Sequence, residues 1–464
     1  MSDTRTERDS MGAVQVPADA LYGAQTARAV ENFRISGWTM PREFIAALAA
    51  IKLSAAEVNR RAGRLKPDIA AAVIEAAIEV VDGKHDRHFP IDVFQTGSGT
   101  STNMNVNEVI ANRAMQLAAG KLGGEKIHPN DHVNLCQSSN DVIPSAIHVA
   151  AATAMSGRLM PALRKLHAAL AGKAIQFDAI VKIGRTHLMD AVPIRLGQEF
   201  SGYASQVEGA QTLLVQALLP LYELPIGGTA VGTGLNAPKG FGQEVCEGLK
   251  RYIAGAWHEA HNHFAAQGAR DAVVFASGTL KAVAVSLSKI ASDIRLLGSG
   301  PRCGIGELVL PATQPGSSIM PGKVNPVLCE SLIQVCCQVI GCDAAISSAA
   351  LGGVGGILEL NVAMPLMAFN LLTAIRLLAC AAEVFADKCI RGLAANAQRC
   401  QELIEQSLAM ITALVPKIGH DAAAALAKEA CDTGKTVREI CREKKLLPED
   451  QLNDLLDPRK QTGD

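Results

Sequence analysis

Apolar residues follow a helical period over most of this 464-residue chain. Spacings of three and four residues place such positions on one face of a helix. The pattern predicts helices in residues 44–53, 69–81, 104–117, 147–170, 198–219, 244–297, 326–347 and 360–393. Helices average about eleven residues, so runs of twenty or more indicate a bundle of long helices. Such a bundle commonly buries further apolar faces against other subunits, and we expect an oligomer.

The two ends of the chain differ from this bundle pattern. Residues 1–40 carry turn-forming residues and few periodic runs, and the segment from about Ala394 is smaller and more charged. We therefore predict a mainly α protein with three domains. These are a mixed, mostly helical domain over 1–137, a central long-helix domain over 138–393 and a small helical domain over 394–464.

Composition narrows the possible functions. Hydrophobic residues make up 48% and aromatic residues 4%, so the core is built mainly from aliphatic side chains. The formal charge of -1 gives no general attraction to nucleic acid or to an anionic membrane. The apolar stretch 364–386 contains Asn370, Arg376 and Glu383, which favours a buried bundle helix over a membrane span. The charged N-terminal residues contain no apolar segment, and we expect a cytoplasmic protein.

The cysteines and histidines do not form a familiar metal motif. The twelve cysteines are scattered without a C-x-x-C pair, which predicts mostly small buried side chains in a reducing compartment. His258, His261 and His263 lack a common ligand spacing and are interpreted as a solvated helix face. The sequence therefore predicts no metal site.

Four polar loops could carry chemistry. The first spans Thr96–Asn103, and the second combines His128–Asp131 with Gln137–Asp141. Both precede predicted helices, where anion binding and helix capping both fit, and capping is favoured for the first loop taken alone. The third, Gly184–Asp190, places His187 after a Gly-Arg-Thr turn.

The fourth loop, Gln314–Pro326, contains Ser317, Ser318, Lys323 and Asn325 between prolines and glycines. Glycine permits a hinge, and lysine is a mobile charge suited to a carboxylate. These loops predict a small anionic substrate. The glycine-rich segments 227–234 and 352–356 lack Gly-x-Gly-x-x-Gly and are interpreted as tight loops between helices.

Residues Gly316–Pro326, which read GSSIMPGKVNP, match the signature of the fumarase/aspartase superfamily. Segments that resemble class II fumarate hydratases extend over essentially the whole chain: 9–12, 22–26, 98–105, 128–131, 137–141, 228–236 and 299–304. The resemblance implies a three-domain, nearly all-helical fold. It also implies a homotetramer with a core of twenty helices, whose active sites combine loops of three subunits.

The same resemblance implies roles for individual residues. Ser317 resembles the base that takes the C3 proton of malate, and His187 paired with Glu330 resembles the group that handles the hydroxyl through a water. The implied substrate ligands are Ser98, Gly99, Thr100, Ser138, Ser139, Asn140, Thr186, Ser318, Lys323, Val324 and Asn325. The implied peripheral dicarboxylate site consists of His128, Pro129, Asn130 and Asp131.

The implied reaction is reversible anti addition of water to fumarate, giving (S)-malate through an aci-carboxylate intermediate without metal or cofactor. An aspartate ammonia-lyase is the alternative, but aspartases carry Gln at the position of His187, which favours the hydratase. Ser101, Met189 and the segment 356–361 depart from the fumarase pattern and leave a shifted substrate preference open. A structural protein that reuses the scaffold is a further alternative, although the implied catalytic residues are all retained.

Overall fold

The computed structural model describes residues 3–119, 126–316 and 318–463. These residues are mainly helical, as the sequence predicts, and their strands occur only in two-stranded pairs. The long helices are α5 (Ser139–Ala154), α6 (Met160–Gln176), α7 (Leu196–Leu221), α10 (Asp271–Leu297), α11 (Val327–Ala350) and α12 (Met364–Phe385). A π-helical turn joins α5 to α6, so one helical run covers the predicted stretch 147–170 and begins earlier than expected.

The chain forms two compact units, each assembled from three separate segments. Unit 1 contains Met1–Pro161, Thr212–Ala284 and Cys337–Ala379, and unit 2 contains Ala162–Gln211, Val285–Cys336 and Cys380–Asp464. The helices α7, α10, α11 and α12 each have residues in both units. The three-domain division predicted from the sequence stays a prediction.

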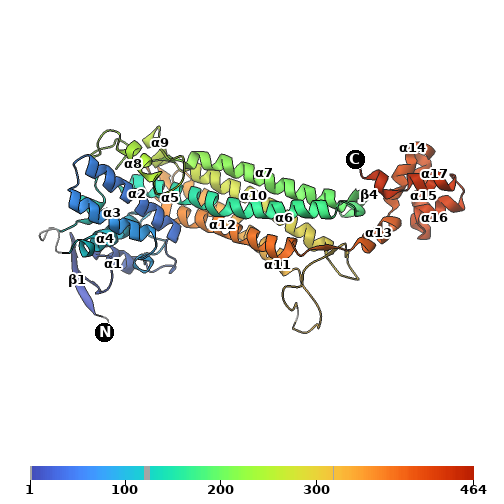
Figure 1. The fold of residues 1–464 in the computed structure, drawn as a ribbon, viewed down its shortest axis with the longest axis horizontal. Coiled ribbons are helices and arrows are strands. Elements are labelled where there is room, and N and C mark those ends of the chain that lie inside the picture. The colour runs from blue at the N-terminus through green and yellow to red at the C-terminus, as the bar shows by residue number, and fades with distance from the viewer. Residues whose placement is uncertain (1–2, 120–125, 317, 464) are drawn as a thin grey trace. The chain divides into compact units, whose positions relative to one another are not determined.

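In unit 1, short helices surround a dense apolar core. Figure 1 shows α2, α3 and α4 packed together, and α2 also packs against α5 and α8. Leu48 and Ile51 of α2 are completely buried, as are Val73 of α3 and Val109 of α4. The remaining elements of this unit are β1 (Thr4–Asp9), β2 (Gly12–Pro17), α1 (Ala24–Asn32), α2 (Arg42–Arg61), α3 (Pro67–Val81), α4 (Thr100–Leu117), β5 (Glu223–Leu224), α8 (Phe241–Leu249), β6 (His258–Glu259), α9 (His263–Gly268), β8 (Gly356–Ile357) and β9 (Leu360–Asn361).

In unit 2, the C-terminal helices pack around a second apolar core. Ile404, Leu414, Leu452 and Leu456 form this core together with Ile183 of β3, and Figure 1 shows the helices α13–α17 clustered in red. The elements of this unit besides the long helices are β3 (Val181–Thr186), β4 (Met189–Arg195), β7 (Leu308–Val309), β10 (Ala394–Ala395), α13 (Ala397–Gln406), α14 (Val415–Ile418), α15 (His420–Thr433), α16 (Val437–Glu443) and α17 (Glu449–Leu455). The C-terminal residues are helical, as predicted, and their separation as a small domain stays a prediction.

Two local predictions are wrong. The predicted helical stretch 244–297 is interrupted, because only its last part, α10, is a long helix. His258 lies in β6 and His263 begins α9, so the histidines do not share a helix face. In addition, the N-terminal region contains a hairpin of β1 with β2 and a helix, α1. The sequence pattern did not predict these elements because turn-forming residues dominate residues 1–40.

Most of the cysteine prediction holds. Eight of the twelve cysteines are buried, while Cys303, Cys337, Cys380 and Cys431 are exposed. Within the described residues, no group of three His, Cys, Asp or Glu side chains is arranged to hold a metal ion.

Among the residues that the structure describes, three helical stretches are long and apolar enough to cross a membrane: Asp271–Leu297, Val327–Ala350 and Met364–Ile390. The most apolar windows of these stretches are 50%, 39% and 56% buried inside the chain. Their exposed apolar side chains include Val285, Ile340 and Val384. Exposed apolar side chains can mark a protein interface, and the expected oligomer stays a prediction. That the protein has no membrane partner stays a prediction.

Candidate functional site

The first polar loop is shaped by two glycines in unit 1. A Cβ atom on Gly97 would lie 1.8 Å from the carbonyl oxygen of Val362, so no larger residue fits there. Gly99 begins α4 with a left-handed φ of 73°, which glycine adopts without steric cost. Gly99 has no side chain that could cap α4, but Oε1 of Gln95 accepts the N–H of Thr102 at 2.9 Å, so one of the first N–H groups of this helix is capped from just before the loop. The N–H groups of Thr100 and Ser101 have no side-chain partner among the described residues and can face a ligand or water.

Hydroxyl groups connect the first and second loops. The Oγ of Ser98 lies 2.8 Å from Oγ1 of Thr100, which lies 2.7 Å from Oγ of Ser139. Ser98 is buried, whereas Thr100 and Ser139 are half-buried and face the surface in part. The hydrogen bonds bring three predicted substrate ligands to the N-termini of α4 and α5, where helix dipoles favour an anion.

The second loop does cap its helix. Ser138 is the N-cap of α5 and forms a capping box with Asp141, whose Oδ1 accepts the N–H of Ser138 at 2.9 Å. The Nδ2 of Asn140 donates to the carbonyl of Ala230 at 2.8 Å, and this bond ties the loop to the glycine-rich segment 227–234. Capping therefore fixes the loop and leaves its other polar groups available for a ligand.

The buried side chain of Asp141 connects the start of α5 to the glycine-rich segment 227–234. Its Oδ2 accepts the N–H groups of Gly227 at 3.1 Å and Thr229 at 2.9 Å, and the side chain has no exposed surface. Burial raises the pKa of Asp141 to about 7, against the lowering effect of the backbone N–H groups and of Lys52.

Lys52 is a buried cation that the sequence analysis did not select as a site residue. Its Nζ lies 3.2 Å from Oδ1 of Asn134 and 3.4 Å from Oε1 of Gln137, and the residue is completely buried. Asn103 donates to the same Asn134 oxygen at 3.2 Å. Burial lowers the pKa of Lys52 to about 7, although Asp141 opposes this. The one sequence signal was a lysine within an otherwise apolar helical stripe.

The predicted peripheral residues form one exposed turn in unit 1. Nδ1 of His128 accepts the N–H groups of Asn130 and Asp131, both at 3.2 Å, and lies 3.2 Å from Oδ2 of Asp131. His128, Asn130 and Asp131 are exposed, and Pro129 is half-buried. The structure therefore brings all four residues together, with the His128 ring already acting as a helix cap.

In unit 2, His187 lies at the tip of the β3–β4 hairpin. Thr186 pairs with Met189, and the two residues between them, His187 and Leu188, have φ values of 57° and 62°. This backbone is normally occupied by Asn or Gly and costs about 1–2 kcal/mol for each other residue. Residues 186–190 are all exposed. A strained histidine presented to solvent is typical of a functional position.

Buried charges anchor the base of this hairpin. The carboxylate of Glu307 has no exposed surface and lies 3.2 Å from Nζ of Lys182 and 2.9 Å from Nη2 of Arg185. Lys182 also pairs with Glu199 at 3.1 Å. Arg185 and Lys182 belong to the strand that ends just before His187, so the network holds that turn in place. Sequence reasoning missed this network because its members are far apart in the chain.

The fourth loop is closed by its own backbone. The N–H of Gly316 donates to the carbonyl of Lys323 at 3.0 Å, and Nδ2 of Asn325 donates to the carbonyl of Gly316 at 2.5 Å. A Cβ on Gly316 would lie 2.3 Å from the Lys323 carbonyl oxygen, so this closure needs glycine.

The predicted residues of the fourth loop differ in accessibility. Ser317 lies outside the described residues. Ser318, Lys323 and Val324 are exposed, and Glu330 is half-buried in the first turn of α11. Within the described part of the chain, no hydrogen bond or ion pair joins His187 to Glu330. A single chain therefore does not form the expected pair.

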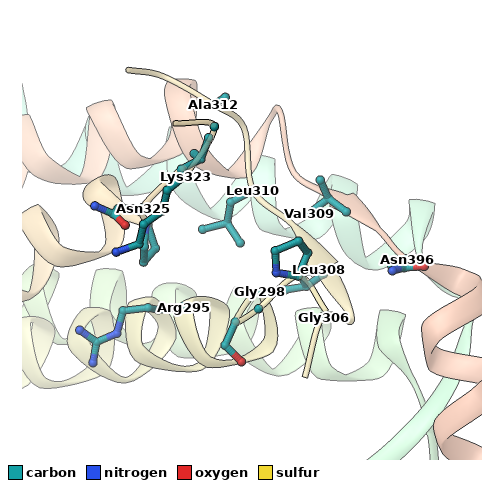
Figure 2. Close-up of a pocket in the computed structure, with 16 residues that line it drawn as sticks. Arg295, Gly298, Gly306, Leu308, Val309, Leu310, Ala312, Lys323, Asn325 and Asn396 are labelled. Carbon is teal, nitrogen blue, oxygen red and sulfur yellow. The ribbon is translucent and has the colours of Figure 1, made fainter. Parts of the chain in front are cut away.

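Lys323, Val324 and Asn325 line a pocket of about 550 Å³ in unit 2 (Figure 2). Arg295 of α10 contributes a second cation, and Leu308 and Leu310 contribute apolar surface. The predicted site residues thus fall into two groups. Unit 1 holds Ser98, Gly99, Thr100, Ser138, Ser139 and Asn140, whereas unit 2 holds Thr186, His187, Ser318, Lys323, Val324, Asn325 and Glu330.

Comparison with known proteins gives consistent matches over the chain. The family model described as "Lyase" matches residues 12–341, and the model described as "Fumarase C C-terminus" matches residues 410–463. A fumarate hydratase class II from Thermosynechococcus vestitus is 55% identical over 443 residues, which cover 95% of this chain and 94% of the relative. The mitochondrial fumarate hydratase 1 of Arabidopsis thaliana is 49% identical, covering 99% of this chain and 93% of the relative. The crystal structure of a class II fumarase from Schistosoma mansoni has a TM-score of 0.94 and 43% identity, with 98% of each chain covered.

Proposed function

This chain belongs to the lyase family of the class II fumarate hydratases, and we propose that it catalyses the reversible addition of water to fumarate, giving (S)-malate. The observation that carries the proposal is 55% identity to a named fumarate hydratase over 95% of the chain. The retained His187, where aspartases carry Gln, favours the hydratase over an aspartate ammonia-lyase.

Unit 1 supplies the binding surface for one substrate carboxylate. The hydroxyls of Ser98, Thr100 and Ser139 are joined there by hydrogen bonds at the N-termini of α4 and α5. The buried side chain of Lys52 donates to Asn134, and that of Asp141 accepts the N–H of Thr229, so both fix the loops beside this surface. Such groups are preorganised, so little free energy is lost in reorienting them when the anion binds.

Unit 2 supplies the groups that transfer protons and bind the reacting carboxylate. Ser317 takes the C3 proton of malate, and His187 with Glu330 delivers a proton to the departing hydroxyl through a water. The intermediate carries two negative charges on one carboxylate, which Lys323 and the N–H groups of the glycine loop stabilise. A serine is a poor base unless its alkoxide is stabilised by such neighbours. Anti elimination requires the base and the acid on opposite faces of the substrate.

The complete site forms between subunits of a homotetramer in this proposal. Support comes from the exposed His187 turn, the absence of a His187–Glu330 contact within the described residues of one chain, and the exposed apolar faces of the long helices. Light scattering after gel filtration tests the assembly, and a mass near four times 48.7 kDa is expected. A monomer with full activity would contradict the shared site.

Two secondary assignments complete the proposal. The turn formed by His128, Pro129, Asn130 and Asp131 binds a second dicarboxylate at the periphery of unit 1. The protein acts in the cytoplasm, although one of its relatives is named mitochondrial. Fluorescence microscopy of the tagged full-length chain in its own cells tests the compartment.

Fumarate absorbance with purified protein tests the reaction itself. We expect consumption of fumarate without ammonium, and dialysis against EDTA should leave the rate unchanged because acid–base chemistry needs no metal or cofactor. Activity that depends on ammonium would replace the hydratase with the ammonia-lyase. Loss of activity in EDTA that is restored by a divalent cation would contradict the metal-free mechanism.

A further inference from the structure

The pocket in Figure 2 contains more positive charge than the proposed reaction uses. Sixteen residues line it, and they include Arg295 and Lys323 but no aspartate or glutamate. An unbalanced pair of cations in a concave site attracts an anion. Arg295 is not among the predicted substrate ligands.

Both cations are available to a ligand. Arg295 and Lys323 are exposed, and within the described part of the chain neither side chain makes a hydrogen bond or ion pair. Arg295 lies in the last turn of α10, where the helix dipole stabilises a cation. The guanidinium and the ammonium are the groups that bind carboxylates most strongly.

Apart from the two cations, the pocket is lined mostly by apolar residues and glycines, with Ser299, Asn325 and Asn396 as further polar residues, and it is larger than a four-carbon diacid requires. Leu308, Val309, Leu310 and Val324 form its walls. Its volume of about 550 Å³ lies within the range of about 300–1,000 Å³ that holds drug-sized ligands. A ligand that fits therefore combines an anionic head with an apolar body.

We propose that this pocket is a second ligand site, which binds an organic carboxylate with an apolar body. Arg295 and Lys323 bind the carboxylate, and Leu308 and Leu310 contact the hydrocarbon part. Because Lys323 and Asn325 also serve the proposed substrate site, an occupied pocket inhibits hydration; this inhibitory part rests on the proposed function.

Calorimetric titration of the full-length protein with 4-phenylbutyrate tests the site. We expect one molecule bound per chain, and at least tenfold weaker binding by Arg295→Met, because a charge-assisted hydrogen bond is lost. Leu310→Asn should weaken binding through the apolar wall. Arg8→Met removes an exposed arginine outside the pocket and is the matched control. The uncharged 4-phenylbutyramide should bind at least tenfold more weakly than the acid.

The outcomes separate this inference from the proposed function. The site is overturned if 4-phenylbutyrate does not bind at concentrations up to about 10 mM. It is also overturned if wild type and Arg295→Met bind 4-phenylbutyrate equally well. Either result holds against the site even if fumarate is hydrated normally. Arg295-dependent binding to a protein that does not hydrate fumarate supports the site and refutes the function. If the wild-type protein hydrates fumarate, 4-phenylbutyrate should inhibit it more strongly than it inhibits Arg295→Met, with each rate compared with the rate of the same protein without inhibitor. This result supports both the site and the proposed function.

Discussion

The two groups of site residues differ in how they are held. In unit 1, hydrogen bonds connect the hydroxyls of Ser98, Thr100 and Ser139. The side chains of Lys52 and Asp141 in the same unit are completely buried. In unit 2, His187 lies on an exposed hairpin tip, and Glu330 is half-buried in the first turn of α11. The predicted ligands of unit 1 are thus held by hydrogen bonds within the chain, whereas in unit 2 the backbone beside His187 is anchored and the His187 side chain is exposed. The difference agrees with the proposal that the acid–base pair forms between subunits.

The largest effect is expected from the proton-transfer half. Ser317→Ala and His187→Asn should each lower kcat by about 10²–10⁴-fold, the usual contribution of a general acid or base. Initial rates measure this, and light scattering should show an unchanged oligomer. Full activity in either variant would show that its assigned role is wrong.

The anchor of the His187 hairpin should have the next largest effect. Glu307→Gln leaves Lys182 and Arg185 without their shared buried carboxylate, and loss of one partner of a buried pair costs about 3–5 kcal/mol. Urea unfolding measures the loss, and kcat should fall more than KM rises. Glu402→Gln, at an exposed pair with Arg399, is the control and should change stability by less than about 1 kcal/mol. Equal effects of the two variants would refute the anchoring role.

The buried cation of unit 1 should have a smaller effect on stability and a different kinetic effect. Lys52→Met removes the donor to Asn134 and Gln137 and should lower the free energy of unfolding by about 1–3 kcal/mol. Since the loop that carries Ser138 and Asn140 loses its support, we expect KM to rise more than kcat falls. Lys417→Met, at an exposed position, should leave both unchanged. A kcat effect without a KM effect would place Lys52 in the proton-transfer half instead.

The smallest expected effect concerns strain at the hairpin tip. Leu188→Gly should raise the free energy of unfolding by about 1 kcal/mol, because glycine adopts a φ of 62° without the Cβ penalty. Leu188→Ala keeps the Cβ atom and is the matched control, for which no gain is expected. Thermal unfolding of both variants measures the difference. Similar melting temperatures for the two variants would show that the turn is not strained.

The helical fold was predictable because it depends on local periodicity. The predicted run 198–219 lies within α7, and both glycine-rich segments are loops between helices. The stretch 244–297 was predicted wrongly, since apolar residues recur there at helical spacing although α8, α9 and β6 interrupt it. The family prediction is confirmed by the comparisons, because it rested on short segments that the sequence displays directly.

The sequence by itself determined the class of fold, the family and the loops that hold the proposed site residues, because helical periodicity and contiguous motifs are local properties of the chain. Only the tertiary structure identified Lys52, Glu307 and Arg295 and separated the site residues into two units. Burial and polar partners decide the roles of Lys52 and Glu307, and the lining of the pocket decides that of Arg295. Lys52 meets its partners more than 80 residues away, and Glu307 meets Arg185 across 122 residues, so no local pattern records either contact.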